Sequence, residues 1–295
     1  MTASFHPPAV AVRRAVTAAL EEDLLPLGDV TASLLPDGIL GEAVFVSRDD
    51  GYLAGMACAI QACAEVDTSL DLTISHDDGD RVAPGSEIAR LTGKFSSIVT
   101  VERTALNFLC HLSGVATLTS LYVARAKQAN PACRILDTRK TTPGLRSLEK
   151  AAVRAGGGTN HRGSLSEGVL IKDNHLGHAD IGEAVNRARA MWPGRMIEVE
   201  CDRIDQVREA FNAGATLILL DNMTTDQLAD CVAWVRGHHR LEASSTLLEA
   251  SGGVNLSTVS AIAATGVDFI SVGSLTHSAP ILDIGLDLVG DSASD

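Results

Sequence analysis

Aromatic residues are scarce in this sequence, where Phe, Trp and Tyr together make up 3% of 295 positions. Proteins that hold single-stranded nucleic acid usually stack its bases on aromatic side chains, and proteins that hold duplexes carry basic stripes. The chain has 37 acidic against 24 basic residues and a formal net charge of −13. Both features argue against nucleic acid as a partner.

Two further absences concern metal sites and compartment. The six cysteines form no Cys-x-x-Cys pair and mostly stand in apolar stretches, which favours buried free thiols in a reducing cytosol over a zinc site. Residues 1–8 lack the charged-then-apolar layout of a signal peptide. No apolar run approaches the roughly 20 residues that a membrane helix needs. We therefore expect a cytoplasmic protein without a membrane partner.

The first third of the chain has the pattern of an α+β unit. Apolar residues, at 45% of the chain, are ample for a core, and the length suits one large α/β barrel or two domains. A helix with apolar groups at helical spacing precedes short β-rich pieces divided by Gly and Asp turns, which predicts a small mixed sheet. The expected elements are helices at 9–23 and 55–67, strands at 43–46, 70–74 and 87–91, and a long helix at 99–129 with a break near Ser113 and Gly114.

From residue 134 onward, short apolar strands alternate with single helices. This alternation is typical of right-handed β-α-β units in a parallel sheet. Six such units within about 140 residues suit a closed or nearly closed α/β barrel. The expected strands are 134–137, 169–172, 196–200, 217–221, 246–250 and 267–272, and the expected helices include 181–190, 204–213, 225–236 and 258–264.

A basic cluster stands out against the acidic chain. Between Arg134 and Lys172 there are eight Lys or Arg and three Asp or Glu, a local balance of +5. A solvated helix face is the ordinary explanation of such a charge run. Here, however, Arg139, Lys140 and Lys172 directly follow short apolar runs, so that the fold would place them at strand ends. We interpret the cluster as a small, local anion site.

The expected carboxyl ends of the strands, where barrels place their reactive groups, carry polar residues throughout. Two of these ends are glycine turns, which match the phosphate site that barrels commonly build after their last two strands. Glycine lets backbone N–H groups approach phosphate oxygens. The candidate residues are Thr138, Arg139, Lys140, Lys172, Glu200, Asp221, Ser251, Gly252, Gly253, Val272, Gly273 and Ser274.

Three of the candidate polar residues allow two interpretations each. Glu200 and Asp221 either form salt bridges with Arg139 or Lys172, or bind sugar hydroxyls, directly or through Mg²⁺, which favours carboxylate and phosphate oxygens. His161 either donates to a ligand carboxylate or is a satisfied structural histidine. Cations, carboxylates and a phosphate cradle together suit a polyanionic substrate pair without a protein nucleophile.

These residues resemble the nicotinate-nucleotide pyrophosphorylase (carboxylating) family, also called quinolinate phosphoribosyltransferase. The resemblance covers most of the chain, and the motif Asp137-Thr138-Arg139-Lys140-Thr141-Thr142-Pro143-Gly144 is specific. The matching segments also include Gly28-Asp29-Val30-Thr31, Glu102-Arg103-Thr104-Ala105-Leu106-Asn107, Asn160-His161-Arg162, Ile171-Lys172-Asp173-Asn174-His175, Glu198-Val199-Glu200, Leu220-Asp221-Asn222, Ser251-Gly252-Gly253 and Val272-Gly273-Ser274.

The resemblance implies a fold and a reaction. The fold is α/β: an incomplete TIM-like barrel over 116–277 with an N-terminal α+β sandwich-like domain over 1–115, onto which 278–295 would pack back. The reaction joins quinolinate to 5-phosphoribosyl 1-diphosphate with Mg²⁺, and it releases diphosphate and CO₂. Its product is nicotinate mononucleotide, an intermediate of de novo NAD synthesis.

The resemblance also implies the roles of individual residues. Lys140, Lys172, Glu200 and Asp221 match catalytic positions, and Glu200 and Asp221 would hold the ribose and Mg²⁺. The two glycine turns would take the 5-phosphate. The family forms dimers, and Arg103 matches an arginine that reaches the partner's site. The residues that would surround quinolinate and the diphosphate are Arg103, Thr138, Arg139, Lys140, His161, Arg162 and Lys172.

Other functions stay open at this point. A related phosphoribosyltransferase could act on nicotinate itself, or be a paralogue linked to molybdenum metabolism, but one carboxylate would not need so many cations. A non-catalytic phosphate-ligand binding protein predicts the loss of Glu200 or Asp221, and both are present. A Schiff-base lyase or aldolase would use Lys172, but that chemistry wants a desolvated amine, and the neighbouring cations suit anion binding instead.

Overall fold

The computed structural model describes residues 5–176, 180–238 and 246–290, and the chain divides into two compact units. The first unit comprises Met1–Ser120, Thr141–Gly157 and Ser274–Asp295, and the second comprises Leu121–Lys140 and Gly158–Gly273. The expected domain bounds, 1–115 and 116–277, stay a prediction; the units differ from them chiefly because Thr141–Gly157 joins the first. Part of the segment examined for a signal peptide (1–4) and the last residues of 278–295 (291–295) lie outside the described residues.

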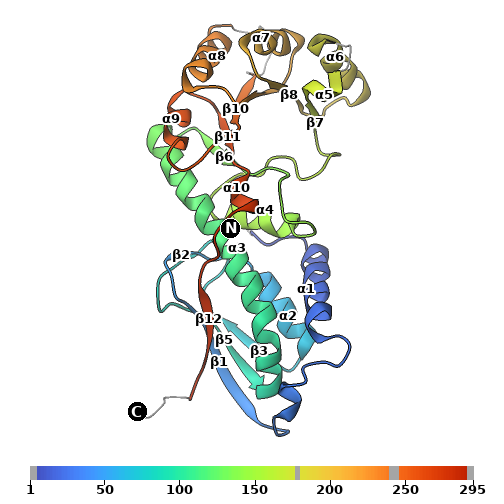
Figure 1. Ribbon diagram of the computed structural model, residues 1–295, viewed down its shortest axis with the longest axis vertical. Coiled ribbons are helices and arrows are strands. Elements are labelled where there is room, and N and C mark those ends of the chain that lie inside the picture. The colour runs from blue at the N-terminus through green and yellow to red at the C-terminus, as the bar shows by residue number, and fades with distance from the viewer. Residues whose placement is uncertain (1–4, 177–179, 239–245, 291–295) are drawn as a thin grey trace. The chain divides into compact units, whose positions relative to one another are not determined.

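The first unit is built on a four-stranded sheet in the order β12-β1-β5-β3 (Figure 1). Every pairing in it is antiparallel, so the expectation of a mixed sheet is wrong. β12, from the C-terminal segment expected to pack back on this domain, pairs with β1. The strands are β1 (Leu40–Ser47), β3 (Asp71–Ile74), β5 (Glu87–Lys94) and β12 (Ile284–Leu288), with β2 (Gly51–Tyr52) and β4 (Arg81–Val82) as a separate pair.

Two short helices of the first unit follow the predicted pattern, those expected at 9–23 and 55–67, and three others were not predicted. Val12, Val16 and Leu20 are buried along one face of the first helix, which packs against the second. The helices are α1 (Ala9–Leu24), the 3₁₀ helix η1 (Ala32–Leu34), α2 (Met56–Val66), α4 (Arg146–Ala155) and α10 (Ser274–His277).

The long helix α3 (Phe95–Ala129) is continuous, so the predicted break near Ser113 and Gly114 is wrong. The Ser113 hydroxyl donates to the carbonyl oxygen of Ala54 at 3.1 Å and accepts from its N–H at 3.0 Å. A Cβ on Gly114 would lie 2.1 Å from the carbonyl oxygen of Pro280. The Ser-Gly pair therefore marks a close approach of neighbouring backbone to α3, rather than its end.

α3 is also long and apolar enough to cross a membrane, which differs from the sequence expectation. However, 61% of its most apolar window is buried inside the protein. A buried core helix of a folded domain has the same length and apolar composition. By length and composition alone, α3 is weak evidence for a membrane span.

All six cysteines are free, and five of them are buried, which confirms the expectation of buried free thiols. Burial raises the pKa of the Cys58, Cys133 and Cys201 thiols to about 12.

The second unit is a parallel sheet in the order β6-β11-β10-β9-β8-β7. Its edge strands, β6 and β7, are not paired with each other in the described part of the chain, so the barrel is incomplete, as the resemblance implied. The strands are β6 (Arg134–Leu136), β7 (Val169–Ile171), β8 (Ile197–Cys201), β9 (Leu217–Asp221), β10 (Leu247–Ser251) and β11 (Phe269–Ser271).

Single helices connect most of these strands, as predicted, at the outer side of the sheet in Figure 1. Local signals set their starts. The Asp180 carboxylate accepts from the backbone N–H of Glu183 at the start of α6, and Thr224 with Gln227 forms a capping box at the start of α8. The helices are α5 (Asp173–Leu176), α6 (Ile181–Met191), α7 (Ile204–Ala213), α8 (Thr225–Gly237) and α9 (Val259–Ala264).

The burial of the second unit's strands explains why they could be predicted from apolar runs in the sequence. Leu217, Ile218, Leu219 and Leu220 of β9 are all buried, because a central parallel strand is covered on both faces. Each such strand ends where the polar candidates begin, and the parallel pairing brings these ends to one edge.

Candidate active site

The carboxyl ends of the second unit's strands surround a cavity of about 590 Å³. Most of the candidate residues line it, together with others that the sequence did not single out. The candidates are Thr138, Arg139, Lys140, His161, Arg162, Lys172, Glu200, Asp221, Ser251, Gly252 and Gly253; the others are Asp137, Leu170, Leu219, Asn222, Glu249 and Ser271.

We call the Lys and Arg residues that line the cavity, Arg139, Lys140, Arg162 and Lys172, the cationic wall. One of them, Arg162, has a hydrogen-bond donor that no described residue uses. Arg162 donates from Nη1 to the carbonyl oxygen of Gly168 at 2.9 Å, while its Nε is buried and, among the described residues, has no acceptor. Burial, and then the charge of Arg139, lower the pKa of Arg162, and Glu198 opposes this shift. Arg139 and Arg162 line the same cavity, and guanidinium groups favour an anion with paired oxygens.

Lys140 is placed by a short turn. Its backbone N–H donates to the hydroxyl oxygen of Thr138 at 3.0 Å, directly after β6. A cation fixed in this way at the end of a strand agrees with the interpretation of the basic cluster as a local site.

The acidic wall consists of Glu200 and Asp221, at the ends of the neighbouring strands β8 and β9. Lys172 forms an ion pair with Glu200, one of the two interpretations that the sequence allowed. Asp221 accepts from the side-chain amide of Asn222 at 2.7 Å. Both carboxylates line the cavity, so the ion pair does not remove Glu200 from it.

The first glycine turn closes the cavity beside Asp221. Gly252 and Gly253 have φ angles of +95° and +62°, a region that glycine enters at no steric cost. Without a Cβ, glycine in this conformation lets a ligand approach the backbone closely. This geometry suits the phosphate interpretation of the turn.

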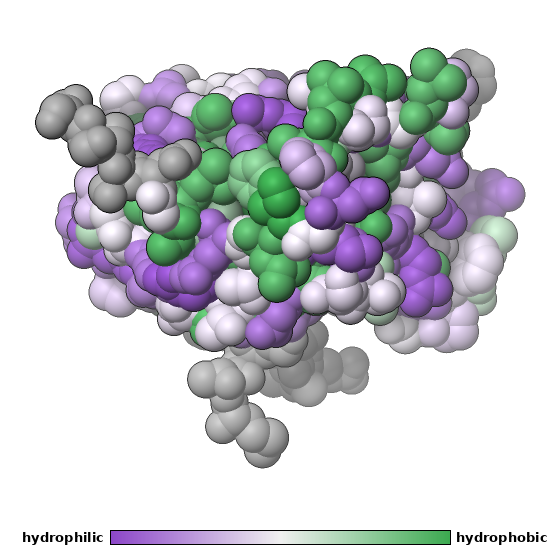
Figure 2. Space-filling view, turned by 90° about the horizontal axis from the view of Figure 1, so that it is seen from below, coloured by the Kyte–Doolittle hydropathy of each residue, from purple (hydrophilic) through white to green (hydrophobic). Residues whose placement is uncertain are grey.

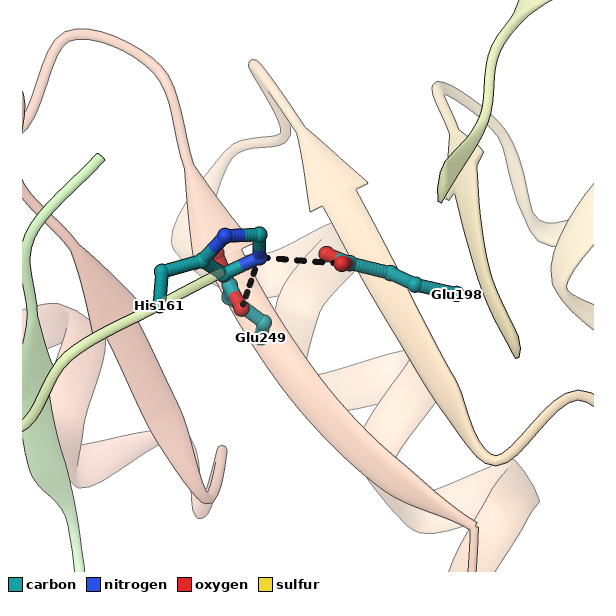
Figure 3. A group of neighbouring side chains, drawn as sticks. All are labelled: His161, Glu198 and Glu249. Carbon is teal, nitrogen blue, oxygen red and sulfur yellow. Dashed lines mark hydrogen bonds and ion pairs between the residues drawn. The ribbon is translucent and has the colours of Figure 1, made fainter. Parts of the chain in front are cut away.

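His161 faces two buried carboxylates, those of Glu198 and Glu249 (Figure 3). Its Nε2 lies 2.9 Å from Glu198 Oε2 and 3.7 Å from Glu249 Oε2. Its backbone N–H donates to Asp137 at 2.9 Å. His161 is therefore held by protein carboxylates and also lines the cavity, so the two interpretations of this residue are compatible.

The sequence interpretation missed Glu249, and it noted Asp137 and Glu198 only as parts of motifs. A signal was present, because each is an acid within or directly after an apolar strand, where a charge is rarely buried without a partner.

Four candidates do not line the cavity. Val272 is buried, and its N–H donates to the carbonyl oxygen of Leu136 at 2.9 Å, which continues the sheet ladder. Gly273 and Ser274 follow it in the sequence, as the last residue of the second unit's final segment and the first residue of the first unit's. Arg103 is exposed on α3 in the first unit. The roles of these four residues stay predictions.

The chain is similar to a known family and to known proteins over most of its length. Residues 29–113 match the N-terminal domain of quinolinate phosphoribosyl transferase, and residues 115–287 match its C-terminal domain. A nicotinate-nucleotide pyrophosphorylase [carboxylating] of Mycobacterium leprae is 39% identical over 282 residues, which cover 94% of this chain and 97% of that protein. A tobacco (Nicotiana tabacum) quinolinate phosphoribosyltransferase [decarboxylating] is 40% identical over 302 residues, covering 95% and 83% of the two chains.

A solved structure shows the same architecture. The nicotinate-nucleotide pyrophosphorylase from Francisella tularensis superimposes with a TM-score of 0.89 at 37% identity, covering 96% of this chain and 98% of that one. The resemblance read from the motifs is thus confirmed over both units. The chain belongs to the quinolinate phosphoribosyl transferase family.

Proposed function

We propose that this chain transfers the phosphoribosyl group of 5-phosphoribosyl 1-diphosphate to quinolinate and decarboxylates it, giving nicotinate mononucleotide, CO₂ and diphosphate for de novo NAD synthesis. One observation carries the proposal: a single cavity joins a cationic wall, two carboxylates and a glycine turn. The buried Nε of Arg162, which has no acceptor in the described part of the chain, is the kind of donor that a substrate carboxylate would satisfy.

The reaction needs binding and charge stabilisation more than proton removal. Arg139, Arg162 and His161 would hold the two carboxylates of quinolinate so that its ring nitrogen points at C1 of the ribose. The nitrogen–C1 bond forms as the C1–oxygen bond to diphosphate breaks, and Glu200 and Asp221 would stabilise the positive charge that develops on the ribose.

Decarboxylation follows from the cationic ring. The bond between C2 and its carboxylate breaks, CO₂ leaves, and the electron pair stays at C2, where the adjacent positive nitrogen stabilises it. A proton then binds at C2, and the 3-carboxylate remains in the product. Lys140 and Lys172 would neutralise the leaving diphosphate.

Mg²⁺ fits the acidic wall. Glu200 and Asp221 offer carboxylate oxygens at the ends of adjacent strands, the ligand type that Mg²⁺ prefers. These two residues would hold the ion, which when bound would add positive charge at the phosphate oxygens. The Lys172–Glu200 ion pair would then share its carboxylate with the ion.

The active unit proposed is a dimer in which Arg103 reaches the partner's cavity. Arg103 is exposed, and one turn earlier the hydroxyl of Thr100 donates to Asp29 at 3.0 Å. The segment around Asp29 exposes Leu27 and Leu34, 81% and 82% accessible. Figure 2 shows hydrophobic side chains gathered between hydrophilic ones on one face. Exposed apolar residues beside a functional arginine favour an interface. We also propose a cytoplasmic location, which the free thiols favour.

The decisive experiment incubates the protein with quinolinate, 5-phosphoribosyl 1-diphosphate and Mg²⁺, and follows CO₂ and mononucleotide. A parallel reaction contains nicotinate in place of quinolinate. We expect turnover of quinolinate and very little of nicotinate, since nicotinate leaves part of the cationic wall unpaired. Comparable kcat/KM for the two acids would overturn the choice of substrate, and no product with either would overturn the activity.

A further inference from the structure

The two buried glutamates beside His161 come from strands that are not neighbours. Glu198 lies on β8 and Glu249 on β10, with β9 between them, and their side chains are 0% and 1% exposed. In barrels, side chains from alternate strands share one interior layer, which is usually made of Val, Ile and Leu. Here that layer contains two carboxylates, and both meet the same imidazole nitrogen (Figure 3).

Keeping these carboxylates inside the barrel is costly. Burial, and then the charge of Glu198, raise the pKa of Glu249 to about 7. Glu198 Oε1 and Glu249 Oε2 are buried and have no hydrogen-bond partner among the described residues. Replacing such groups by apolar side chains is often neutral or stabilising, so stability alone does not explain them. Both carboxylates lie beside Nε2 of His161, at 2.9 and 3.7 Å.

We propose that Glu249 is a positioning residue of this site, which together with Glu198 holds Nε2 of His161 and so fixes the imidazole in the wall that receives the acid substrate. In this proposal, Nε2 carries the proton of the 2.9 Å contact and donates it to Glu198 Oε2. Glu249 flanks that contact from the second strand and limits rotation of the ring. The inference rests on the proposed function for the identity of the substrate. The contacts among His161, Glu198 and Glu249 do not depend on that function.

A metal ion is the alternative occupant of this cluster, since one His and two Glu offer suitable atoms within 4.8 Å of one another. The 2.9 Å separation of Nε2 and Glu198 Oε2 is a hydrogen-bond length. A bridging metal would push these two atoms apart, because each would lie about 2.1 Å from the ion at a wide angle. The observed contact therefore favours a proton between them.

The first test compares Glu249→Leu with Glu249→Gln. Leucine removes the polar contact at similar volume, and we expect the KM for quinolinate to rise about tenfold or more, as misplaced binding groups do. The KM for 5-phosphoribosyl 1-diphosphate should change less than about twofold, and glutamine, whose amide oxygen can accept, should keep most of the wild-type value. An unchanged KM for quinolinate in Glu249→Leu, or an equal rise in both KM values, would overturn the proposal.

The second test asks whether Glu249 acts through His161. In a double-mutant cycle, Glu249→Leu should add no further rise to the KM for quinolinate once His161→Ala is present. Additive effects would refute the coupling. Asp268→Asn is the matched control. It breaks an ion pair between Asp268 and Arg236, two residues that do not line the cavity, and should lower the melting temperature without moving this KM.

Two readouts separate this inference from the proposed function. Nitrogen-15 NMR of the ligand-free protein should show Nε2 of His161 protonated and hydrogen-bonded in the wild type, with the signal altered in Glu249→Leu; identical signals would refute positioning even if the enzyme is active. Metal analysis should give the same metal content for the purified wild-type protein and for Glu249→Leu. If the wild type holds an ion that Glu249→Leu lacks, the cluster is a metal site and the proposal is wrong.

Discussion

Asn222 occupies the space that a side chain on Gly252 would need. The Asn222 Oδ1 atom lies 2.2 Å from the position of a Cβ on Gly252, whose φ is +95°. Asn222 itself has a left-handed φ of 53°, and its N–H donates to the carbonyl oxygen of Ser251 at 2.9 Å. Asn222 therefore packs the end of β9 against the end of β10, and this contact joins Asp221 of the acidic wall to the glycine turn.

This contact predicts the effect of Gly252→Ala. The methyl group would displace Asn222 and strain a left-handed backbone, which together cost about 1–3 kcal/mol of stability. We expect the KM for 5-phosphoribosyl 1-diphosphate to rise by about tenfold or more, measured by steady-state kinetics beside thermal unfolding. Gly253→Ala is the matched comparison, because nothing lies within 4 Å of its Cβ position and only the backbone strain remains. Equal effects of Gly252→Ala and Gly253→Ala on this KM and on thermal stability would contradict a role for the Asn222 contact.

Arg162 should contribute strongly to quinolinate binding. Replacing it with Ala removes a partly buried charge with an unused donor, and we expect a loss of about 2–4 kcal/mol in kcat/KM for quinolinate. Arg139→Ala should behave alike. Arg162→Lys should recover little, since an ammonium cannot pair with a carboxylate through two parallel bonds. The control is Arg195→Ala, an exposed arginine of the same unit. Wild-type affinity for quinolinate in both the Arg162 and Arg139 variants would argue against this assignment.

The stability of the protein should depend on the titration of Glu249. Its pKa rises from an ordinary 4.5 to about 7 in the folded state. Between these values the folded protein holds a proton that the unfolded chain has lost, so this group's contribution to stability falls as the pH rises through that window. Glu249→Gln cannot titrate. We expect its melting temperature relative to wild type to increase by a few degrees from about pH 5 to about pH 8. A constant difference would show that Glu249 does not titrate there.

The elements of the second unit could be predicted because each carries a local signal. The apolar run of β9 and the helical spacing of α7 reproduce their predicted bounds, 217–221 and 204–213. The cavity residues Arg139, Lys172 and Asp221 follow from these strands, because parallel strands bring their carboxyl ends to one edge.

Other features depend on contacts that the sequence does not display. The partner of Glu249 is His161, 88 positions away by their numbers and on a segment without regular secondary structure. Ser113 and Gly114 look like a helix break, but the backbone around Ala54 and Pro280 uses them as a packing point. In both cases tertiary structure decides the role of a residue whose local pattern indicates another.

The thiols should be inert in the folded protein. Burial raises the pKa of Cys63 and Cys231 to about 11, and that of three other cysteines to about 12, so almost none of these thiols ionises near neutral pH. We expect a disulfide reagent to modify at most Cys110, the only partly exposed cysteine, until denaturant is added. Rapid modification of several thiols in the native protein would show local opening of the core.

The last prediction concerns the sharing of the active site between two chains. If Arg103 acts in the partner's cavity, then Arg103→Ala and Lys172→Ala should each be nearly inactive alone, since each removes one cation from every site. After subunit exchange, random pairing makes half of the dimers mixed, and one of the two sites in each mixed dimer has both residues intact. About a quarter of wild-type activity should therefore return under two-fold symmetry.

Two further mixtures serve as controls. Arg103→Ala mixed with Arg162→Ala should recover likewise. Lys172→Ala mixed with Arg162→Ala should not recover, because Lys172 and Arg162 line the same cavity of one chain. No recovery in the first two mixtures would place Arg103 within its own chain's site or outside any site. Recovery in the last mixture would contradict a site in which Lys172 and Arg162 come from the same chain.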